Sequence, residues 1–218
     1  MRRVAGLLVL VVVVLVLGVG QLVLPGIAAS VLRDRLAKSG HVLSVKVSAF
    51  PAIELLWHQA DSVVVRMADY RSGVGHLDSL LQESRNVGTL NASVGVLRSG
   101  LLTLHGVRLT KRGSQLTGSA TVLDSDLRNA IPVLQSVRLL SASAGAVTLE
   151  GTGSFLGVTA SVPATVEPQD GRLVVVPQTP VGGLFSVTVF AQPHLSVQGV
   201  GGTAIAGGLK VTARARLT

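Results

Sequence analysis

After residue 40, apolar and polar side chains alternate along much of the chain, which is typical of strands with one buried and one solvated face. The segment 209–217 is the clearest case. Its apolar positions are Leu209, Val211, Ala213, Ala215 and Leu217, and its polar positions are Lys210, Thr212, Arg214 and Arg216. A two-residue period over this length predicts a half-buried strand.

The same period predicts further strands, separated by turn residues. In chain order they cover residues 43–49, 61–68, 89–97, 101–110, 116–123, 136–142, 145–151, 154–166, 173–176, 184–191 and 195–200. Residues 111–114 predict the turn of a hairpin, because Gly113 can take a positive φ, and the Asp-Gly pair at 170–171 predicts another. Residues 69–75 are interpreted as a loop, and the glycine-rich stretch 199–208 as a flexible connection.

Three short helices are also predicted. In residues 26–40, apolar side chains recur near one face, and basic residues occupy much of the rest. This helix either lies along a membrane or packs on the following sheet, and its narrow apolar stripe favours packing. Residues 76–86 have leucines at helical spacing. Asp124 and Asp126 can cap a third helix, which Pro132 keeps short.

An uncharged apolar run of 21 residues, 4–24, precedes this pattern. As a helix it is about 31 Å long, which matches a hydrocarbon core of about 30 Å. Arg2 and Arg3 would stay on the cytoplasmic side and place the rest of the chain outside. Cleavage after Ala28 is an alternative, although the length of the run favours an uncleaved anchor.

Two regions follow from this interpretation. Residues 1–25 are a transmembrane signal-anchor or signal peptide, and residues 26–218 are one extracytoplasmic domain. The expected location is therefore the cytoplasmic membrane, crossed once, with the domain on the periplasmic or cell-wall side. If the leader is cleaved, the domain is secreted.

Composition narrows the classes of partner. The formal net charge is +8, yet the basic residues stand singly along the sequence, so most are expected to be ordinary solvated positions. No basic run indicates nucleic acid, and export argues against it as well. The chain contains no cysteine, which excludes disulfides and thiolate metal sites.

Few residues point to chemistry. The five histidines are widely separated and form no metal-ligand spacing. The closest carboxylates, Asp124 and Asp126, are better explained as helix caps than as an acid–base pair. There is no nucleophile elbow, phosphate-binding loop or dinucleotide fingerprint. We therefore expect no enzyme, no metal and no cofactor.

Together these elements predict an α+β domain of mostly antiparallel strands, in which a strongly curved sheet or open barrel wraps a core. An apolar cavity between sheet and helices would suit an acyl chain, since each buried CH₂ contributes about 0.8 kcal/mol. Periodicity does not separate a hollow interior from a filled one. On the residues alone a filled core is favoured.

The order of segments carries a resemblance. A strand ending in Phe50-Pro51, the DSVVV strand at 61–65, HGVRL at 105–109 leading into a hairpin, a short Asp-capped helix and a final alternating strand follow one another. Over residues 26–218 this order resembles the LmeA-like family of actinobacterial cell-envelope proteins. The chain departs from that pattern in its long apolar leader and its glycine-rich stretch before the last strand.

The resemblance implies a phospholipid-binding envelope protein with a tubular lipid-binding fold, in which a curved sheet around a helix encloses an apolar groove. It also implies a link to lipoglycan handling. The expected partners are a phospholipid or other acyl-chain lipid and the cytoplasmic membrane. The alternative is an envelope scaffold with a filled core and no ligand.

The candidate lipid-lining residues come from the two strands at the Phe-Pro corner, the corner itself and the helix predicted at 76–86. They are Phe50, Trp57, Val63, Val65, Leu77, Leu80 and Leu81. For each of them simple core packing is the competing interpretation.

Overall fold

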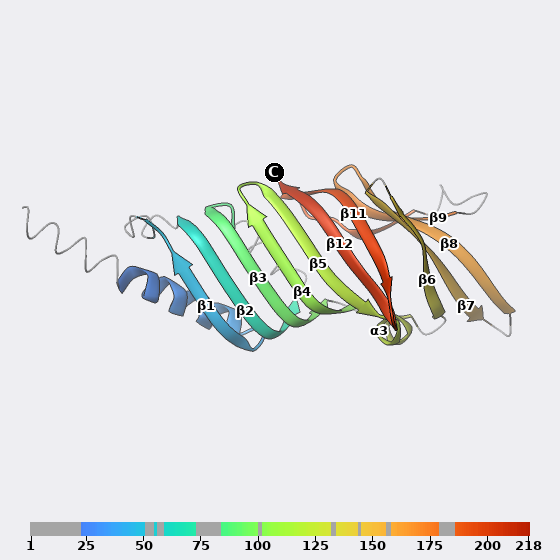
Figure 1. Cartoon of the computed structure of the whole chain (residues 1–218), viewed down its shortest axis with the longest axis horizontal. Coiled ribbons are helices and arrows are strands. Elements are labelled where there is room, and N and C mark those ends of the chain that lie inside the picture. Colours follow the sequence, from blue (N-terminus) through green and yellow to red (C-terminus); the bar gives the residue numbers. More distant parts are fainter. Residues whose placement is uncertain are drawn as a thin grey trace, which may run out of the picture.

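The computed structural model describes residues 23–50, 55, 59–72, 84–99, 102–131, 134–143, 145–155, 158–178 and 186–218. These residues form an elongated molecule in which two β-sheets follow one another along the long axis (Figure 1). The predicted class, mostly antiparallel β with short helices, is confirmed. The predicted single curved sheet or open barrel is wrong, because the described strands divide into two sheets.

Sheet A has seven strands and sheet B has five. In spatial order, sheet A consists of β1 (Val42–Ser48), β2 (Ala60–Ser72), β3 (Val87–Ser99), β4 (Leu102–Arg112), β5 (Gln115–Leu123), β12 (Gly208–Leu217) and β11 (Leu195–Ile205). Sheet B consists of β10 (Val187–Phe190), β9 (Arg172–Pro177), β8 (Val158–Gln169), β7 (Ala146–Phe155) and β6 (Leu134–Ser143).

The predicted hairpins are confirmed. β4 and β5 pair around a turn in which Gly113 has φ 56°, and β8 and β9 pair around Asp170 and Gly171 at φ 51° and 75°. β12 has the expected alternation, with Leu209, Ala215 and Leu217 buried.

A helix over residues 23–37 packs on the first two strands of sheet A. Leu36, 8% exposed, joins a buried cluster with Val63 and Val65 of β2, and Leu32 packs against the same cluster. The helix runs through Pro25 without a break, so the expected start at residue 26 is wrong. Packing on the sheet, the favoured interpretation, is what these contacts show.

β2 and β3 form a parallel pair, which differs from the expected antiparallel order. A parallel pair needs a long crossover, here residues 73–86, of which 73–83 lie outside the described residues together with most of the predicted helix 76–86. β2 also continues to Ser72, so the expected loop at 69–75 begins too early.

The parallel pair fits closely because the two strands share one apolar spacing. The residues of both strands that pack in the cluster are Ala60, Val63, Val65, Met67 and Tyr70 on β2, and Val87, Leu90, Ala92, Val94 and Leu97 on β3. In both strands two successive cluster residues are three positions apart at the same two places, 60–63 facing 87–90 and 67–70 facing 94–97. Gly95 lies in the second of these places. A Cβ there would lie 2.5 Å from the carbonyl oxygen of Ala68, so the close approach requires glycine.

Sheet A therefore has two chemically different faces. The inner face is the one on which the helix packs, and the cross-strand row Leu90, Lys111, Leu116, Ala215 and Val197 lies on it. The outer face carries the alternate positions, including the row Arg66, Ser93, Arg108, Ser119 and Thr212.

The two sheets meet at β11. The backbone N–H groups of Val197 and Val200 donate to the carbonyl oxygens of Gly171 and Gly145, at 2.8 and 2.7 Å, so turns of sheet B cover the free edge of β11. The glycine-rich stretch 199–208, expected to be flexible, instead forms the β11–β12 hairpin.

Glycine is used there because the sheets approach closely. A Cβ at Gly202 would lie 3.3 Å from Val147 and 3.6 Å from Leu139, both side chains of sheet B. The expectation of flexibility followed from composition, which does not reveal a neighbouring sheet.

Two local details also differ from expectation. A register shift between Val42 and Ser44 buries Val42 and leaves Leu43, expected on the apolar face, 57% exposed. The helix α3 (Asp124–Ala130) has Leu123 at its N-cap with no side-chain capping bond. Asp126 instead accepts a hydrogen bond from His105 Nε2 at 2.8 Å, which ties α3 to β4.

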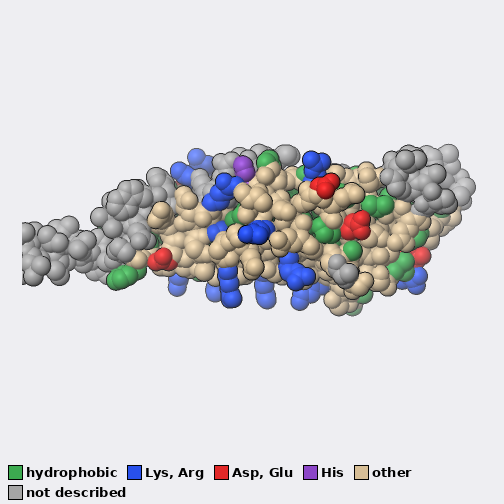
Figure 2. Space-filling view, turned by 90° about the horizontal axis from the view of Figure 1, so that it is seen from above, with side chains coloured by type: hydrophobic (Ala, Val, Ile, Leu, Met, Phe, Trp, Pro, Cys, Tyr) green, Lys and Arg blue, Asp and Glu red, His purple; other side chains and the backbone are tan. Residues whose placement is uncertain are grey.

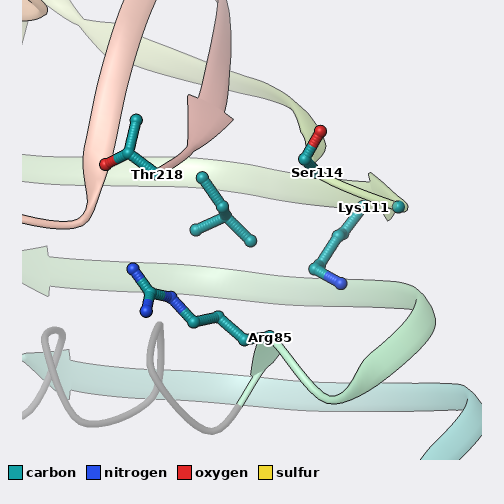
Figure 3. A pocket seen from close by; sticks show the side chains of 6 residues that line it. Arg85, Lys111, Ser114 and Thr218 are labelled. Carbon is teal, nitrogen blue, oxygen red and sulfur yellow. The ribbon is translucent and has the colours of Figure 1, made fainter.

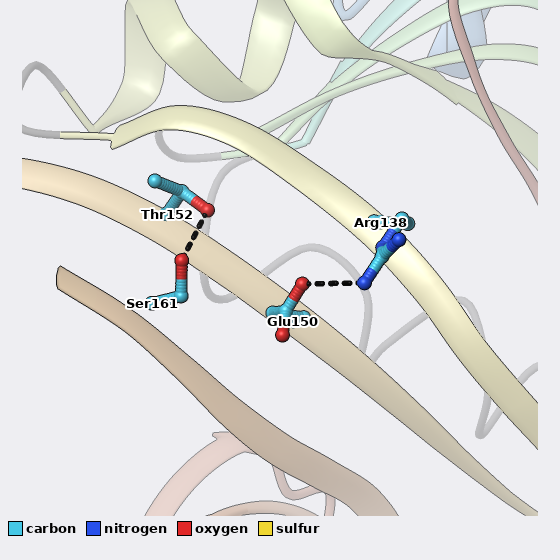
Figure 4. A network of polar contacts seen from close by, with 4 residues as sticks. All are labelled: Arg138, Glu150, Thr152 and Ser161. Atoms are coloured by element: carbon cyan, nitrogen blue, oxygen red, sulfur yellow. Dashed lines mark hydrogen bonds and ion pairs between the residues drawn. The ribbon is translucent and has the colours of Figure 1, made fainter.

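Polar pairs span neighbouring strands of sheet B (Figure 4). Arg138 of β6 is paired with Glu150 of β7 at 2.9 Å, and Thr152 of β7 with Ser161 of β8 at 2.8 Å. Arg138 and Glu150 thus neutralise one another across neighbouring strands.

Residues 1–22, most of the predicted anchor, lie outside the described residues. Within the described ranges, no helix is long and apolar enough to cross a membrane.

Candidate functional site

The inner face of sheet A is apolar over most of its width. Its residues on the central strands are half-buried or buried: Leu90, Ala92, Val94, Leu104, Val107, Leu109, Leu116, Ala120, Val122, Leu209, Val211, Ala213, Ala215 and Leu217. They follow from the two-residue period of β3, β4, β5 and β12, because successive side chains of a strand point to opposite faces. An acyl chain would meet only carbon on such a surface.

Lys111 interrupts this apolar face near the end of β4. It lies directly across from Leu90 on one side and Leu116 on the other, and it is 1% exposed. Its Nζ donates a hydrogen bond to the backbone carbonyl of Val87. Among the described side chains, no carboxylate forms an ion pair with it.

Arg85 extends across the same end of the inner face. One of its guanidinium nitrogens lies 3.2 Å from Nδ1 of His194. Arg85 precedes β3 and His194 precedes β11, and the three strands β4, β5 and β12 lie between these two in the sheet. The side chain therefore bridges strand ends that are four neighbours apart.

A pocket of about 230 Å³ lies between these two cations (Figure 3). Its lining consists of Arg85, Lys111, Gly113, Ser114, Leu217 and Thr218. The β4–β5 turn forms one wall, and the backbone N–H of Leu217 donates to the carbonyl oxygen of Ser114 at 2.9 Å, which fixes the end of β12 against that turn. The pocket thus joins two cations, the hydroxyl residues Ser114 and Thr218, and the edge of an apolar face.

The electrostatics favour an anion. Burial lowers the pKa of Lys111, because its charged form loses hydration and gains only one carbonyl partner. A buried cation without a counter-ion is costly, and a bound anion would relieve that cost. Phosphate oxygens are strong acceptors for ammonium and guanidinium donors.

The predicted lipid-lining residues are only partly described. Val63 and Val65 lie on the inner face, 6% and 7% exposed, in the cluster that packs against the helix. Phe50, two residues after β1, is 81% exposed and does not belong to that cluster. Trp57, Leu77, Leu80 and Leu81 lie outside the described residues.

Lys111 and Arg85 are not among the site residues predicted from the sequence. The signal for Lys111 was present: in β4 it continues the apolar positions Val107 and Leu109, while Arg108 and Thr110 hold the polar ones. The predicted turn at 111–114, however, includes Lys111 and so separates it from these apolar positions. No local pattern marks Arg85, because its role depends on strands distant in the sequence. The described residues also contain no group of three or more potential metal ligands.

A family model described as LmeA-like phospholipid-binding matches residues 16–213. The chain belongs to this family. The expected resemblance is thereby confirmed, and the family is one that binds phospholipid.

A search of curated proteins found no match. Among solved structures, a STAR-related lipid transfer protein fragment from Xanthomonas axonopodis is 15% identical and covers 52% of this chain and 76% of its own, with a TM-score of 0.19. That score is too low to support an argument about fold or ligand.

Proposed function

We propose that this protein is an extracytoplasmic, membrane-tethered phospholipid-binding protein without enzymatic activity. The lipid phosphate lies in the pocket between Arg85 and Lys111, and the acyl chains lie along the inner face of sheet A. Family membership supports the ligand class, and the residues of the pocket support the position of the headgroup.

The observation that carries the proposal is the buried ammonium of Lys111. A lysine in an apolar row lowers the stability of the fold unless something compensates its charge. Arg85, Ser114 and Lys111 together can donate the hydrogen bonds that the oxygens of a phosphodiester accept.

The volume of the pocket supports this division of the lipid between pocket and apolar face. A pocket of about 230 Å³ is smaller than the roughly 300–1,000 Å³ of sites that enclose a whole small ligand. In this proposal the pocket takes the headgroup, and the acyl chains extend over the adjoining apolar surface. There each buried CH₂ contributes about 0.8 kcal/mol.

Tethering is the part of the proposal that rests on the sequence. The run at 4–24 has the length and composition of a membrane anchor, and the two arginines before it support a domain outside the cytoplasm. A role in lipid or lipoglycan handling in the cell envelope is consistent with such a position.

A photoactivatable phospholipid tests the proposal at residue level. The full chain is reconstituted in vesicles containing a phospholipid with a diazirine on its acyl chain, illuminated, digested and sequenced by mass spectrometry. We expect cross-links at the inner positions Val94, Leu109 and Val211. The outer neighbours Ser93, Arg108 and Thr212 in the same peptides serve as internal controls.

Cross-links that alternate in this way support the proposal, because only one face of each strand then meets acyl chain. Equal labelling of both faces would contradict it. Labelling confined to residues 1–25 would also contradict it and would leave the scaffold with a filled core.

A further inference from the structure

Positive charge is concentrated on one of the two sheets. The strands of sheet A contain ten Lys or Arg residues and two Asp residues, whereas the strands of sheet B contain two of each sign. Along the sequence the basic residues stand singly. They are dispersed in the sequence and gathered by the fold.

All but Lys111 of the ten side chains belong to the outer face, and each is exposed. We call this surface the basic outer face; its cations are Lys46, Arg66, Arg71, Arg98, Arg108, Arg112, Lys210, Arg214 and Arg216. Figure 2 shows a row of Lys and Arg side chains projecting from one long side of the molecule.

The cations are spread over two dimensions and interleaved with hydroxyl groups. In one cross-strand row Ser93 separates Arg66 from Arg108, and in the next Thr117 lies directly across from Arg214. Neighbouring strands are about 4.8 Å apart, so Arg66 and Arg108 begin about 10 Å from one another. The face is thus a broad array of donors.

The acidic residues of the sheet do not neutralise this face. Asp61 and Asp69 lie near the two ends of β2, where their carboxylates accept the backbone N–H groups of Phe50 and His41. Among the described side chains, the ion pairs His105–Asp126 and Arg138–Glu150 use none of the nine cations.

We propose that the basic outer face docks on the surface of a bilayer that contains anionic phospholipid. A plane of lipid phosphates matches a two-dimensional array that extends from β1 to β12, whereas a linear polyanion would occupy a single row. The strands of sheet A contain one aromatic residue, Tyr70, and it is buried, so the face has no platform for base stacking. This surface docking is distinct from the binding of one lipid in the pocket and does not depend on it.

Docking of this kind is electrostatic and depends on salt. Each cation near an anionic surface strengthens binding by roughly 5-fold, so three of them together contribute on the order of 100-fold. Screening shortens the range of the interaction from about 10 Å at 0.1 M salt to about 3 Å at 1 M. The docked state should therefore be lost at high salt.

Site-specific fluorescence quenching tests the orientation directly. The chain contains no cysteine, so Thr117→Cys on the basic outer face and Thr159→Cys on β8 each give one labelling site in the full chain. Both positions are exposed. The labelled proteins are reconstituted in vesicles with a nitroxide-headgroup lipid, containing either phosphatidylglycerol or phosphatidylcholine alone.

We expect quenching at position 117 in phosphatidylglycerol vesicles only, its loss at 1 M salt, and none at position 159. The triple variant Arg66→Gln, Arg108→Gln, Arg214→Gln should lose the quenching, while the three matching Arg→Lys changes should retain it. Equal quenching at both positions, or none at 117 with anionic lipid, would overturn the proposal. Retention of quenching by the Gln variant would also overturn it. So would a competition experiment in which duplex DNA releases the docked protein at a lower concentration than added phosphatidylglycerol vesicles do.

Discussion

Nζ of Lys111 donates a hydrogen bond to the backbone carbonyl of Val87 across the inner face of sheet A. The bond holds a cation in an apolar row next to the pocket that we assign to a lipid phosphate. Function and stability therefore place opposite demands on this residue.

Lys111→Met should stabilise the unliganded fold. Methionine keeps much of the side-chain volume and removes a buried charge with one partner, so we expect the free energy of unfolding to rise by about 1–3 kcal/mol. Urea denaturation measures this. Lys38→Met, which removes an exposed charge, should change it by less than about 0.5 kcal/mol. A fall in stability for Lys111→Met would show that the ammonium is a structural group.

The stability difference between wild type and Lys111→Met should depend on pH. Because the folded-state pKa of Lys111 is lowered, the unfolded chain binds more protons between that pKa and the ordinary value near 10.4. The free energy of unfolding of the wild type therefore rises relative to that of the variant as pH rises through this window. Burial raises the pKa of Tyr70, which acts in the opposite direction, but Tyr70 is present in both proteins. Urea denaturation of both proteins from pH 7 upward measures this difference in the free energy of unfolding. We expect the difference to shrink as pH rises, and a constant difference would contradict the account.

Leu36→Ala should loosen the N-terminal helix from sheet A. Leu36 is 8% exposed and packs in the cluster with Val63 and Val65, so its truncation should cost about 2–4 kcal/mol. Val31→Ala, on the same helix but 49% exposed, is the matched control and should cost less than about 0.5 kcal/mol. Thermal melts of the two variants compare them, and equal shifts would mean that the helix is not anchored by Leu36.

Gly95→Ala should disrupt the parallel β2–β3 pair. Its Cβ would lie 2.5 Å from the backbone oxygen of Ala68, which is not free to move, so we expect a loss of about 2 kcal/mol or more. Gly118→Ala on β5 introduces the same methyl group with its nearest contact at 3.8 Å, to Leu109. Hydrogen exchange of β3 amides measures the effect locally. Similar protection in both variants would show that the close approach at residue 95 is not required.

The sequence predicts local structure here better than it predicts arrangement. The alternation of apolar and polar residues predicted β12 and the β4–β5 hairpin, because a strand with one buried face shows that burial in its own consecutive residues. It did not reveal the parallel β2–β3 pair or the second sheet, since both depend on contacts between distant segments. Gly202 is an example. Glycine is needed there because Val147 of sheet B lies close by, and that contact is known only from the structure.

The site shows the same limit. The resemblance in segment order predicted a phospholipid-binding family, which the match to residues 16–213 confirms. The lining residues chosen from apolar character stay predictions. The pocket is lined by a lysine and an arginine that were not among them. Arg85 reaches His194, 109 positions away in the chain, and no pattern around either residue indicates the other.

Phosphorus content tests the central claim most directly. The full chain, Lys111→Met and Lys38→Met are purified in a detergent without phosphorus, their lipids are extracted, and phosphate per chain is measured. Removing one charge-assisted donor should weaken phospholipid binding by roughly 10- to 100-fold. We predict about one phospholipid per chain for wild type and Lys38→Met and a several-fold lower content for Lys111→Met. Equal phosphate in all three proteins, or none in the wild type, would contradict a headgroup site at Lys111.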